Sequence, residues 1–257
     1  MNPRTVADYQ TYKPIGIANY GSIPHLPSSR MGKGKHHLER GQARIATRTP
    51  RDYRDLVIVQ EKLDGANVGV VKLQGKLVCL SRSGHDCSIS PYPLHRLFVR
   101  FVKKNEARFQ VLLEEGERVC GEWLLVAHGT RYALPHEPLV VFDIFNPQNE
   151  RLTYHDFILR VLPLGFVVPR LLHIGQPLPI EKALQLLDKD TSRHGALESI
   201  EGAIWRVERN EKVDFLCKYV KHGKKDGIYL DDNHLIFNQI PEHLQYLTQP
   251  ILPEECL

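Results

Sequence analysis

A lysine, a carboxylate and a glycine stand close together after an apolar run in the first third of the chain. Lys62, Asp64 and Gly65 follow the apolar residues 56–59. A lysine amine is protonated at neutral pH and becomes a nucleophile when burial, neighbouring cations or a metal lower its pKa. Asp64 can accept hydrogen bonds from a ribose or hold the loop, and Gly65 lets the backbone approach a ligand closely. The spacing suits a lysine that attacks a nucleotide, but a polar hairpin turn also fits it.

Further short polar segments follow this lysine in a defined order: 81–84, 121–124, 140–145, 201–204 and 216–221. Several partial matches in one order are much rarer by chance than a single match. Together with 59–67, the series resembles the covalent nucleotidyltransferase superfamily of polynucleotide ligases and capping enzymes. It is most similar to the phage-type RNA ligases that seal breaks in duplex RNA. The resemblance covers residues 20–221, which is most of the chain.

The resemblance implies a role for individual residues. Lys62 would attack the α-phosphate of ATP, release pyrophosphate and carry a lysyl phosphoramidate, and Lys218 would contact the same phosphate as a second catalytic residue. The nucleotide would be bound by these further positions: Glu61, Asp64, Gly65, Asn67, Arg82, Glu122, Phe142, Glu201, Lys218 and Lys221.

Two of these positions, Glu122 and Glu201, would also hold the catalytic metal, and we expect each at the start of a strand beside a glycine. A hard divalent cation, Mg²⁺, would offset charge on the triphosphate as pyrophosphate departs. Taken alone, either glutamate is more often a solvated strand end. Arg82 suits phosphate as a planar donor, and Phe142 would stack on the purine. A turn arginine and a core phenylalanine are the plain alternatives for these two.

The sequence departs from the family pattern at two positions. The family places two lysines one residue apart in the last motif, whereas Leu216 stands where the first would be. Lys221 is then the candidate for the second charge, although its spacing puts it on the other face of a regular strand. Asp64 is the other departure, because the most similar RNA ligases often carry another residue there and DNA ligases carry aspartate. A DNA substrate therefore stays open.

Composition limits the classes that this chain can belong to. The 257 residues have a formal charge of +4 and are 42% hydrophobic, which is compatible with one large domain and a phosphate-rich partner. Between residues 30 and 54 only Glu39 and Asp52 are acidic, and a nucleic-acid-contacting segment and a solvated loop both fit this run. Its basic residues are Arg30, Lys33, Lys35, Arg40, Arg44, Arg48, Arg51 and Arg54.

Cysteine spacing and hydropathy indicate the compartment. The cysteines show no paired spacing, which argues against a zinc ribbon or a disulfide framework; they are Cys79, Cys87, Cys120, Cys217 and Cys256. The N-terminus lacks the apolar core of a signal peptide, and no apolar run approaches the roughly 18 residues of a membrane span. We therefore expect a soluble, cytoplasmic protein with no membrane partner.

Apolar spacing predicts the elements that position these residues. Strands are expected over 56–59, 68–73, 77–80, 119–125, 139–145, 203–207 and 215–220, with the almost wholly apolar 139–145 as a central strand. Helices are expected over 94–113, 180–187 and 241–247. Residues 1–50 are expected to be irregular, with one strand at most. The sum is an α+β fold of mainly antiparallel sheet with flanking helices, which the resemblance identifies as a nucleotidyltransferase (ligase adenylation domain) fold.

We divide the chain into a basic, loop-rich N-terminal segment of the same domain (1–55), a nucleotidyltransferase core (56–225) and a C-terminal extension (226–257). The extension is too short for an oligonucleotide-binding barrel. The resemblance implies an ATP-dependent RNA ligase that joins 5′-phosphate and 3′-hydroxyl ends in RNA repair, alone or with a partner protein. An ATP-dependent DNA ligase, a capping-type guanylyltransferase and a catalytically degenerate nucleotide- or RNA-binding relative remain as alternatives.

Overall fold

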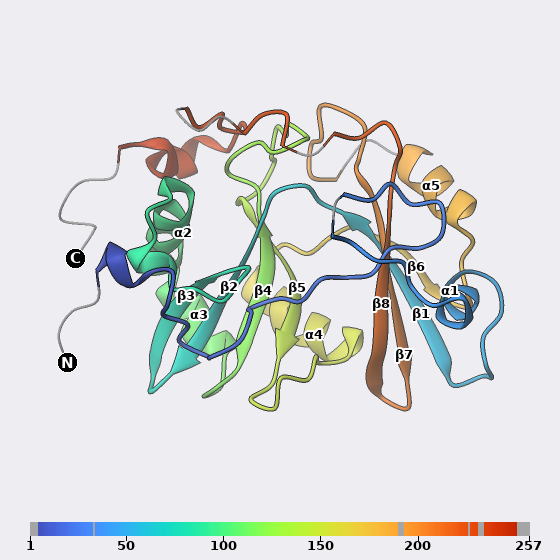
Figure 1. Cartoon of the computed structure of the whole chain (residues 1–257). Helices are drawn as coiled ribbons and strands as arrows, with labels where there is room; N and C mark the ends of the chain where they lie inside the picture. The colour runs from blue at the N-terminus through green and yellow to red at the C-terminus, as the bar shows by residue number, and fades with distance from the viewer. Residues whose placement is uncertain (1–4, 33, 190–192, 226, 231–233, 251–257) are drawn as a thin grey trace.

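Two antiparallel four-stranded sheets stand side by side in the computed structural model (Figure 1). It describes residues 5–32, 34–189, 193–225, 227–230 and 234–250, so Lys33 and Cys256 lie outside the described residues. Figure 1 shows α2 and α3 beside the first sheet and α1 and α5 beside the second. The predicted α+β fold with antiparallel sheets and flanking helices is confirmed.

The first sheet has the order β3-β2-β4-β5, and its strands are β2 (Ala66–Leu73), β3 (Lys76–Ser81), β4 (Arg118–Trp123) and β5 (Leu139–Phe145). The second has the order β6-β1-β7-β8, and its strands are β1 (Asp55–Lys62), β6 (Leu171–Gly175), β7 (Gly202–Arg209) and β8 (Lys212–Val220). Every predicted strand is present, and β6 is an addition that the sequence pattern did not reveal.

Helices flank both sheets (Figure 1), and α4 packs against β5. The α-helices are α1 (Arg40–Thr47), α2 (Pro93–Lys104), α3 (Glu106–Leu112), α4 (Tyr154–Val161) and α5 (Ile180–Lys189). Short 3-10 helices are η1 (Val6–Asp8), η2 (Cys87–Ile89), η3 (Leu162–Leu164) and η4 (Glu242–Thr248). Within the described ranges no helix is long and apolar enough to cross a membrane.

The consecutive strands β1 and β2 belong to different sheets. The segment between Lys62 and Ala66 therefore carries the chain from one sheet to the other, and the hairpin alternative is wrong. Side chains alternate along β1, β7 and β8, so that odd-numbered residues such as Val59 and Trp205 pack in one core with residues of α1 and α5. Even-numbered residues, Lys62 among them, point to the opposite side, between the two sheets.

Three expectations about elements are corrected. The helix expected over 94–113 is two helices, because Asn105 leaves the helical conformation with φ −111° and ψ 19° and its side chain donates to the Phe101 carbonyl over 2.9 Å. The run 139–145 is an edge strand rather than a central one. It is buried because the Val141 N–H donates to the Val167 carbonyl and α4 packs on the strand. Residues 1–50 hold the helix α1 instead of a strand.

A buried ion cluster joins the two sheets. Asp143 on β5 accepts hydrogen bonds from Arg206 on β7 over 2.5 Å, from the Tyr20 hydroxyl over 2.6 Å and from Arg151 over 3.2 Å. The side chains of Asp143 and Arg206 are 1% and 3% exposed, and Arg206 also donates to Glu208. Charge-assisted bonds in such a dry place are strong, so this cluster fixes the separation of the sheets.

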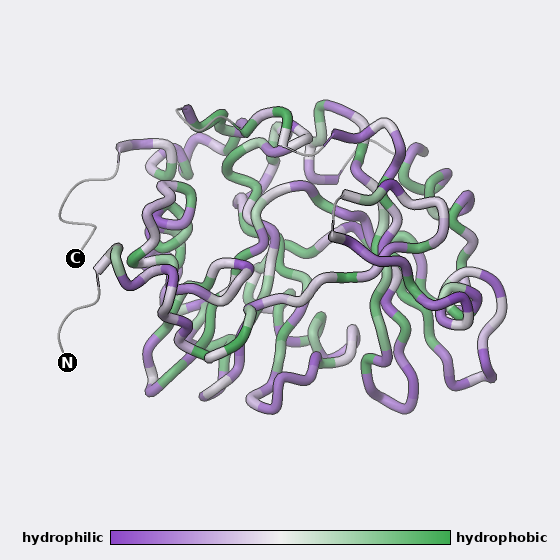
Figure 2. The backbone as a smooth tube through the Cα atoms, viewed as in Figure 1, coloured by the Kyte–Doolittle hydropathy of each residue, from purple (hydrophilic) through white to green (hydrophobic). Residues whose placement is uncertain are grey.

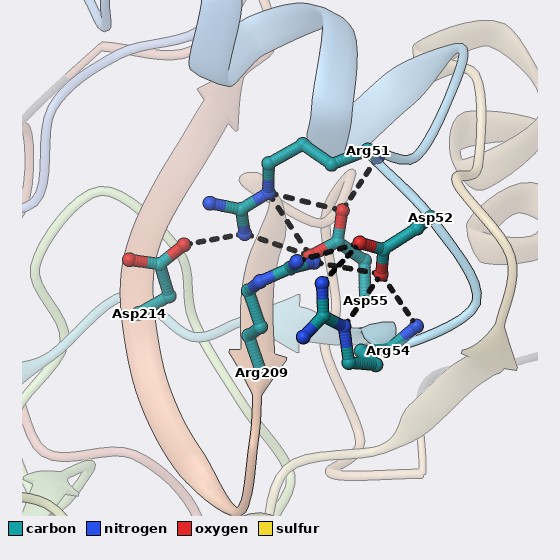
Figure 3. A network of polar contacts seen from close by, with 6 residues as sticks. All are labelled: Arg51, Asp52, Arg54, Asp55, Arg209 and Asp214. Atoms are coloured by element: carbon teal, nitrogen blue, oxygen red, sulfur yellow. Dashed lines mark hydrogen bonds and ion pairs between the residues drawn. The ribbon is translucent and has the colours of Figure 1, made fainter.

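A second ion network lies in the second sheet at the end away from Lys62, around the start of β1 (Figure 3). Arg209 at the end of β7 bonds Asp52 and Asp55, and Arg51 bonds Asp55 and Asp214 of β8. The Asp55 side chain is fully buried at the first position of β1. The network therefore ties the start of β1 to the β7–β8 hairpin.

We expect Asp143→Asn to lower the free energy of unfolding by about 3 kcal/mol, because Arg206 loses one of its two buried counter-charges. Lys212→Ala is the control, since Lys212 pairs with Glu150 at 3.8 Å where both side chains are exposed, and its cost should stay below about 0.5 kcal/mol. Urea denaturation measures both variants. Equal costs for the two would contradict a clamp at Asp143.

Candidate active site

A cavity of about 870 Å³ lies between the two sheets and is lined by residues of both. A volume of this order is typical of a site for a nucleotide-sized ligand. The cavity lining includes all the predicted nucleotide-binding residues except Lys221: Glu61, Lys62, Asp64, Gly65, Asn67, Arg82, Glu122, Phe142, Glu201 and Lys218. Residues separated by more than 150 positions in the sequence thus meet in one place.

Lys62 is the last residue of β1 and points at a carboxylate. Its Nζ donates to Glu201 Oε2 over 2.5 Å and to the Leu63 carbonyl over 3.2 Å, and its side chain is 19% exposed. Burial alone would lower the pKa of Lys62, but the Glu201 and Glu122 carboxylates outweigh it and raise the pKa above its ordinary value. In this state the amine is an ammonium and lacks the lone pair that a nucleophile needs.

The two glutamates approach this lysine from different sheets. Glu201 directly precedes β7, as expected, but Glu122 is near the end of β4 rather than at a strand start, which corrects its predicted place. Burial raises the pKa of Glu122 to about 7 against the opposing effect of Lys62, and burial also raises the pKa of Glu201. Burial therefore disfavours the charged form of both carboxyls, and the charge of Lys62 offsets part of that effect.

Glu122 and Glu201 suit a hard divalent cation. Both are carboxylates in a cavity with a single lysine between them, and oxygen ligands of this kind are what Mg²⁺ prefers. In the described parts of the chain, no group of three or more His, Cys, Asp or Glu side chains is arranged to hold a metal alone. A cation here would complete its shell with substrate phosphates and water, as Mg²⁺ commonly does.

Asp64 and Gly65 position loops. The Asp64 carboxylate accepts hydrogen bonds from the Gly129 N–H over 3.1 Å and the Thr130 hydroxyl over 3.0 Å. Of the two roles predicted for Asp64, the structure therefore shows loop holding. A Cβ on Gly65 would lie 2.7 Å from the Trp123 carbonyl oxygen, so glycine is needed for the approach of β4. Its part in the approach of a ligand stays a prediction.

The aromatic end of the cavity is formed by Phe142 and Tyr20. Phe142 is half-buried, and its ring meets the Tyr20 ring edge-on with centroids 5.1 Å apart. A fixed ring that lines a cavity offers a face on which a base can stack. Asn67 lies beside Glu122 in the β2–β4 pairing, and Arg82 is exposed at the lining just after β3.

β8 contributes Lys218 but not Lys221. Lys218 lines the cavity, and burial together with the neighbouring Lys62 lowers its pKa to about 8. Leu216 lines the same face two residues earlier. Lys221 Nζ instead donates to Asp188 Oδ1 over 2.8 Å, outside the cavity lining. The structure does not bring Lys221 to the other predicted residues.

The N-terminal segment supplies lining residues that no motif identified. His25, Arg30 and Lys35 line the cavity, because the segment crosses in front of both sheets (Figure 1). Burial lowers the pKa of His25 to about 4, with Lys218 as the next cause, so its ring is neutral and hydrogen-bonded to Ser29. The basic composition of 30–54 was the one sequence signal for this contribution.

The remaining residues of that basic run fall into two groups. Arg51 and Arg54 are engaged with Asp52 and Asp55 in the network of Figure 3. The arginines on α1 and directly after it are exposed. Figure 2 shows that the segment leading into this helix is largely hydrophilic. These exposed residues are Arg40, Arg44 and Arg48.

Comparison with known proteins adds a family match and structural similarities. The RNA ligase family model matches residues 55–220. The fold is similar to an apo mutant of the Naegleria gruberi RNA ligase, at 13% identity and TM-score 0.52, over 86% of this chain and 61% of that one. Another mutant of that protein, with ATP and Mn, matches at 16% identity and TM-score 0.51, over 82% and 61%.

An archaeal ATP-dependent RNA ligase matches at 20% identity and TM-score 0.47, over 79% of this chain and 48% of that one. The chain thus spans less than two thirds of the length of each of these solved proteins. The Naegleria similarities support the fold. No curated protein matches the sequence significantly.

Lys62 and Lys218 are expected to titrate in a defined order. Competitive acetylation of the nucleotide-free protein, read by peptide mass spectrometry, should give Lys218 a midpoint near pH 8 and Lys62 a midpoint above the ordinary lysine range. Glu201→Gln should lower the pKa of Lys62, because the burial remains and the facing charge is lost. A lower pKa for Lys62 than for Lys218 in the unaltered protein would contradict the ion pair.

Proposed function

The chain belongs to the RNA ligase family, and we propose that it is an ATP-dependent RNA ligase that joins 5′-phosphate and 3′-hydroxyl ends through a lysyl-AMP intermediate. The observation that carries the proposal is the buried contact between Lys62 and Glu201 inside a nucleotide-sized cavity. We further propose that its substrate is a break in duplex RNA, on the strength of the phage-type motif series.

In the first step, the deprotonated Lys62 amine attacks the α-phosphorus of ATP. An N–P bond forms, the bond from this phosphorus to the bridging oxygen breaks, and pyrophosphate leaves with the electron pair. Glu201, 2.5 Å from Nζ, is placed to accept the proton that the amine gives up. Phe142 offers the purine its ring face. Lys218, which lines the cavity from the same sheet as Lys62, would balance phosphate charge.

Glu122 and Glu201 are the residues that would hold Mg²⁺, whose charge would offset that on the departing pyrophosphate. If Mg²⁺ engaged Glu122, one of the two carboxylates that keep Lys62 charged would be neutralised, and burial would then lower the pKa of the amine. Glu201 would remain beside the amine to accept its proton.

The second and third steps use the same cavity. The 5′-phosphate of the RNA attacks the adenylate phosphorus, so that the N–P bond breaks and Lys62 recovers its amine. The 3′-hydroxyl then attacks the 5′-phosphorus, the new phosphodiester bond forms, and AMP leaves. Arg82, exposed beside the cavity, is placed to meet the phosphate of the entering strand with its planar donors.

The alternatives have less support. Asp64, the residue that kept a DNA substrate open, is occupied by hydrogen bonds to Gly129 and Thr130, so its identity follows from holding that loop. A capping-type guanylyltransferase would take its label from GTP rather than ATP. A degenerate relative is motivated by Leu216 alone, while Lys62, both glutamates and Lys218 all line the cavity.

With ATP labelled at the α-phosphate and Mg²⁺, we expect the protein to take up one covalent label per chain. Lys62→Ala should abolish labelling, because no other amine stands at that position. Lys218→Ala should slow it about tenfold to a hundredfold by removing a phosphate contact. Lys221→Ala is the matched control, because its amine bonds Asp188 outside the cavity, and it should label like the parent. Undiminished labelling of Lys62→Ala would refute the mechanism.

The substrate is tested with nicked duplexes of matched sequence, built from RNA, DNA or one strand of each. The proposal expects sealing to be fastest where the strand with the 3′-hydroxyl is RNA and to weaken steeply as salt rises, since phosphate contacts dominate such binding. Gel analysis of the sealed strand measures the rate. Faster sealing of DNA nicks would transfer the proposal to the DNA ligase alternative.

A further inference from the structure

The free edge of β8 is extended by two short pieces of the N-terminal segment. Lys218 N–H donates to the Pro24 carbonyl over 3.0 Å, and Leu26 N–H donates to the Lys218 carbonyl over 2.8 Å. His25 N–H donates to the His36 carbonyl over 2.9 Å. Both bridges, between His25 and Lys218 and between His25 and His37, are parallel. Around the cavity the second sheet therefore continues beyond β8.

Parallel pairing brings a lysine to the same side of the sheet as Leu216. The two bridges are isolated, and the residues two positions before Lys218, His25 and His37 are Leu216, Ile23 and Lys35. All three line the cavity, as residues on one face should. Lys35 is two strand spacings from Leu216, roughly 10 Å between backbones, which a long lysine side chain largely spans.

The charges of the cavity leave a place for this lysine. The charge of Lys62 on β1 is matched by Glu201. On β8, Leu216 brings no charge to the cavity, so Lys218 is the cation that this strand contributes to the lining. Lys35 is close enough for its positive charge to contribute to the lowered pKa of both Lys218 and His25. Over the residues that the structure describes, the Lys35 side chain is half-buried and has neither a hydrogen bond nor an ion pair.

We propose that Lys35 supplies the second phosphate-binding cation of the cavity and so replaces, from across the sheet, the lysine that Leu216 lacks. This inference rests on the proposed function for the identity of the ligand, a nucleoside triphosphate. It assigns to the N-terminal segment a direct part in nucleotide binding. It also accounts for the departure from the family pattern at Leu216.

The affinity for ATP, measured by calorimetry in the presence of Mg²⁺, is the primary test. Lys35→Ala should weaken ATP binding about tenfold to a hundredfold, the usual effect of losing a charge-assisted contact. Arg40→Ala, which removes an exposed arginine of α1, is the control and should bind like the parent. Calorimetry reports ATP affinity and does not depend on the covalent step. If the protein bound ATP but never became labelled, the proposed function would be contradicted, and the affinities of the variants would still test the role of Lys35.

The decisive variant restores the charge on β8. In the Lys35→Ala background, Leu216→Lys should recover most of the lost affinity, because it returns a cation to the same cross-strand row. Leu216→Met in that background keeps an apolar side chain of similar volume and should recover nothing. Thermal unfolding of each variant confirms that it is folded. Parental affinity in Lys35→Ala, or equal recovery by lysine and methionine, would overturn the proposal.

Discussion

The buried contact between the Lys62 ammonium and the Glu201 carboxylate is the constraint on which the rest of the site depends. Neither charge would be stable alone in a place so withdrawn from water, and each is compensated by the other. The same contact keeps the lysine from acting as a nucleophile. The amine must therefore pass its proton on before it can attack. In the resting protein the two carboxylates hold the nucleophile in its charged form.

The placement of this pair follows from the division of the chain between two sheets. β1 delivers Lys62 and the start of β7 delivers Glu201, while β4 brings Glu122 from the other sheet. The distance between these groups is thus set by how the sheets stand, and the buried contact of Asp143 with Arg206 holds that separation. Stability of the inter-sheet cluster and geometry of the reactive lysine are properties of one arrangement.

Much of this arrangement could be predicted from the sequence, because period-two hydrophobicity and short motifs are local signals. Strand partners are not local: nothing near Lys62 revealed that β1 and β2 join different sheets. The apolar run of β5 reflected cover by α4 rather than a central position, and the break at Asn105 depended on one side-chain bond. The contribution that we propose for Lys35 depends on the bridges that join His25 to His37 and to Lys218, and only the folded chain shows these.

Lys62 as the covalently modified residue is the central claim, and locating the adduct tests it most directly. The protein is incubated with ATP and Mg²⁺, digested, and its peptides are sequenced by mass spectrometry. The account predicts one AMP group on the side-chain nitrogen of Lys62, through a phosphoramidate that acid cleaves. An AMP group on Lys218, Lys35 or any other residue, with Lys62 unmodified, would contradict it.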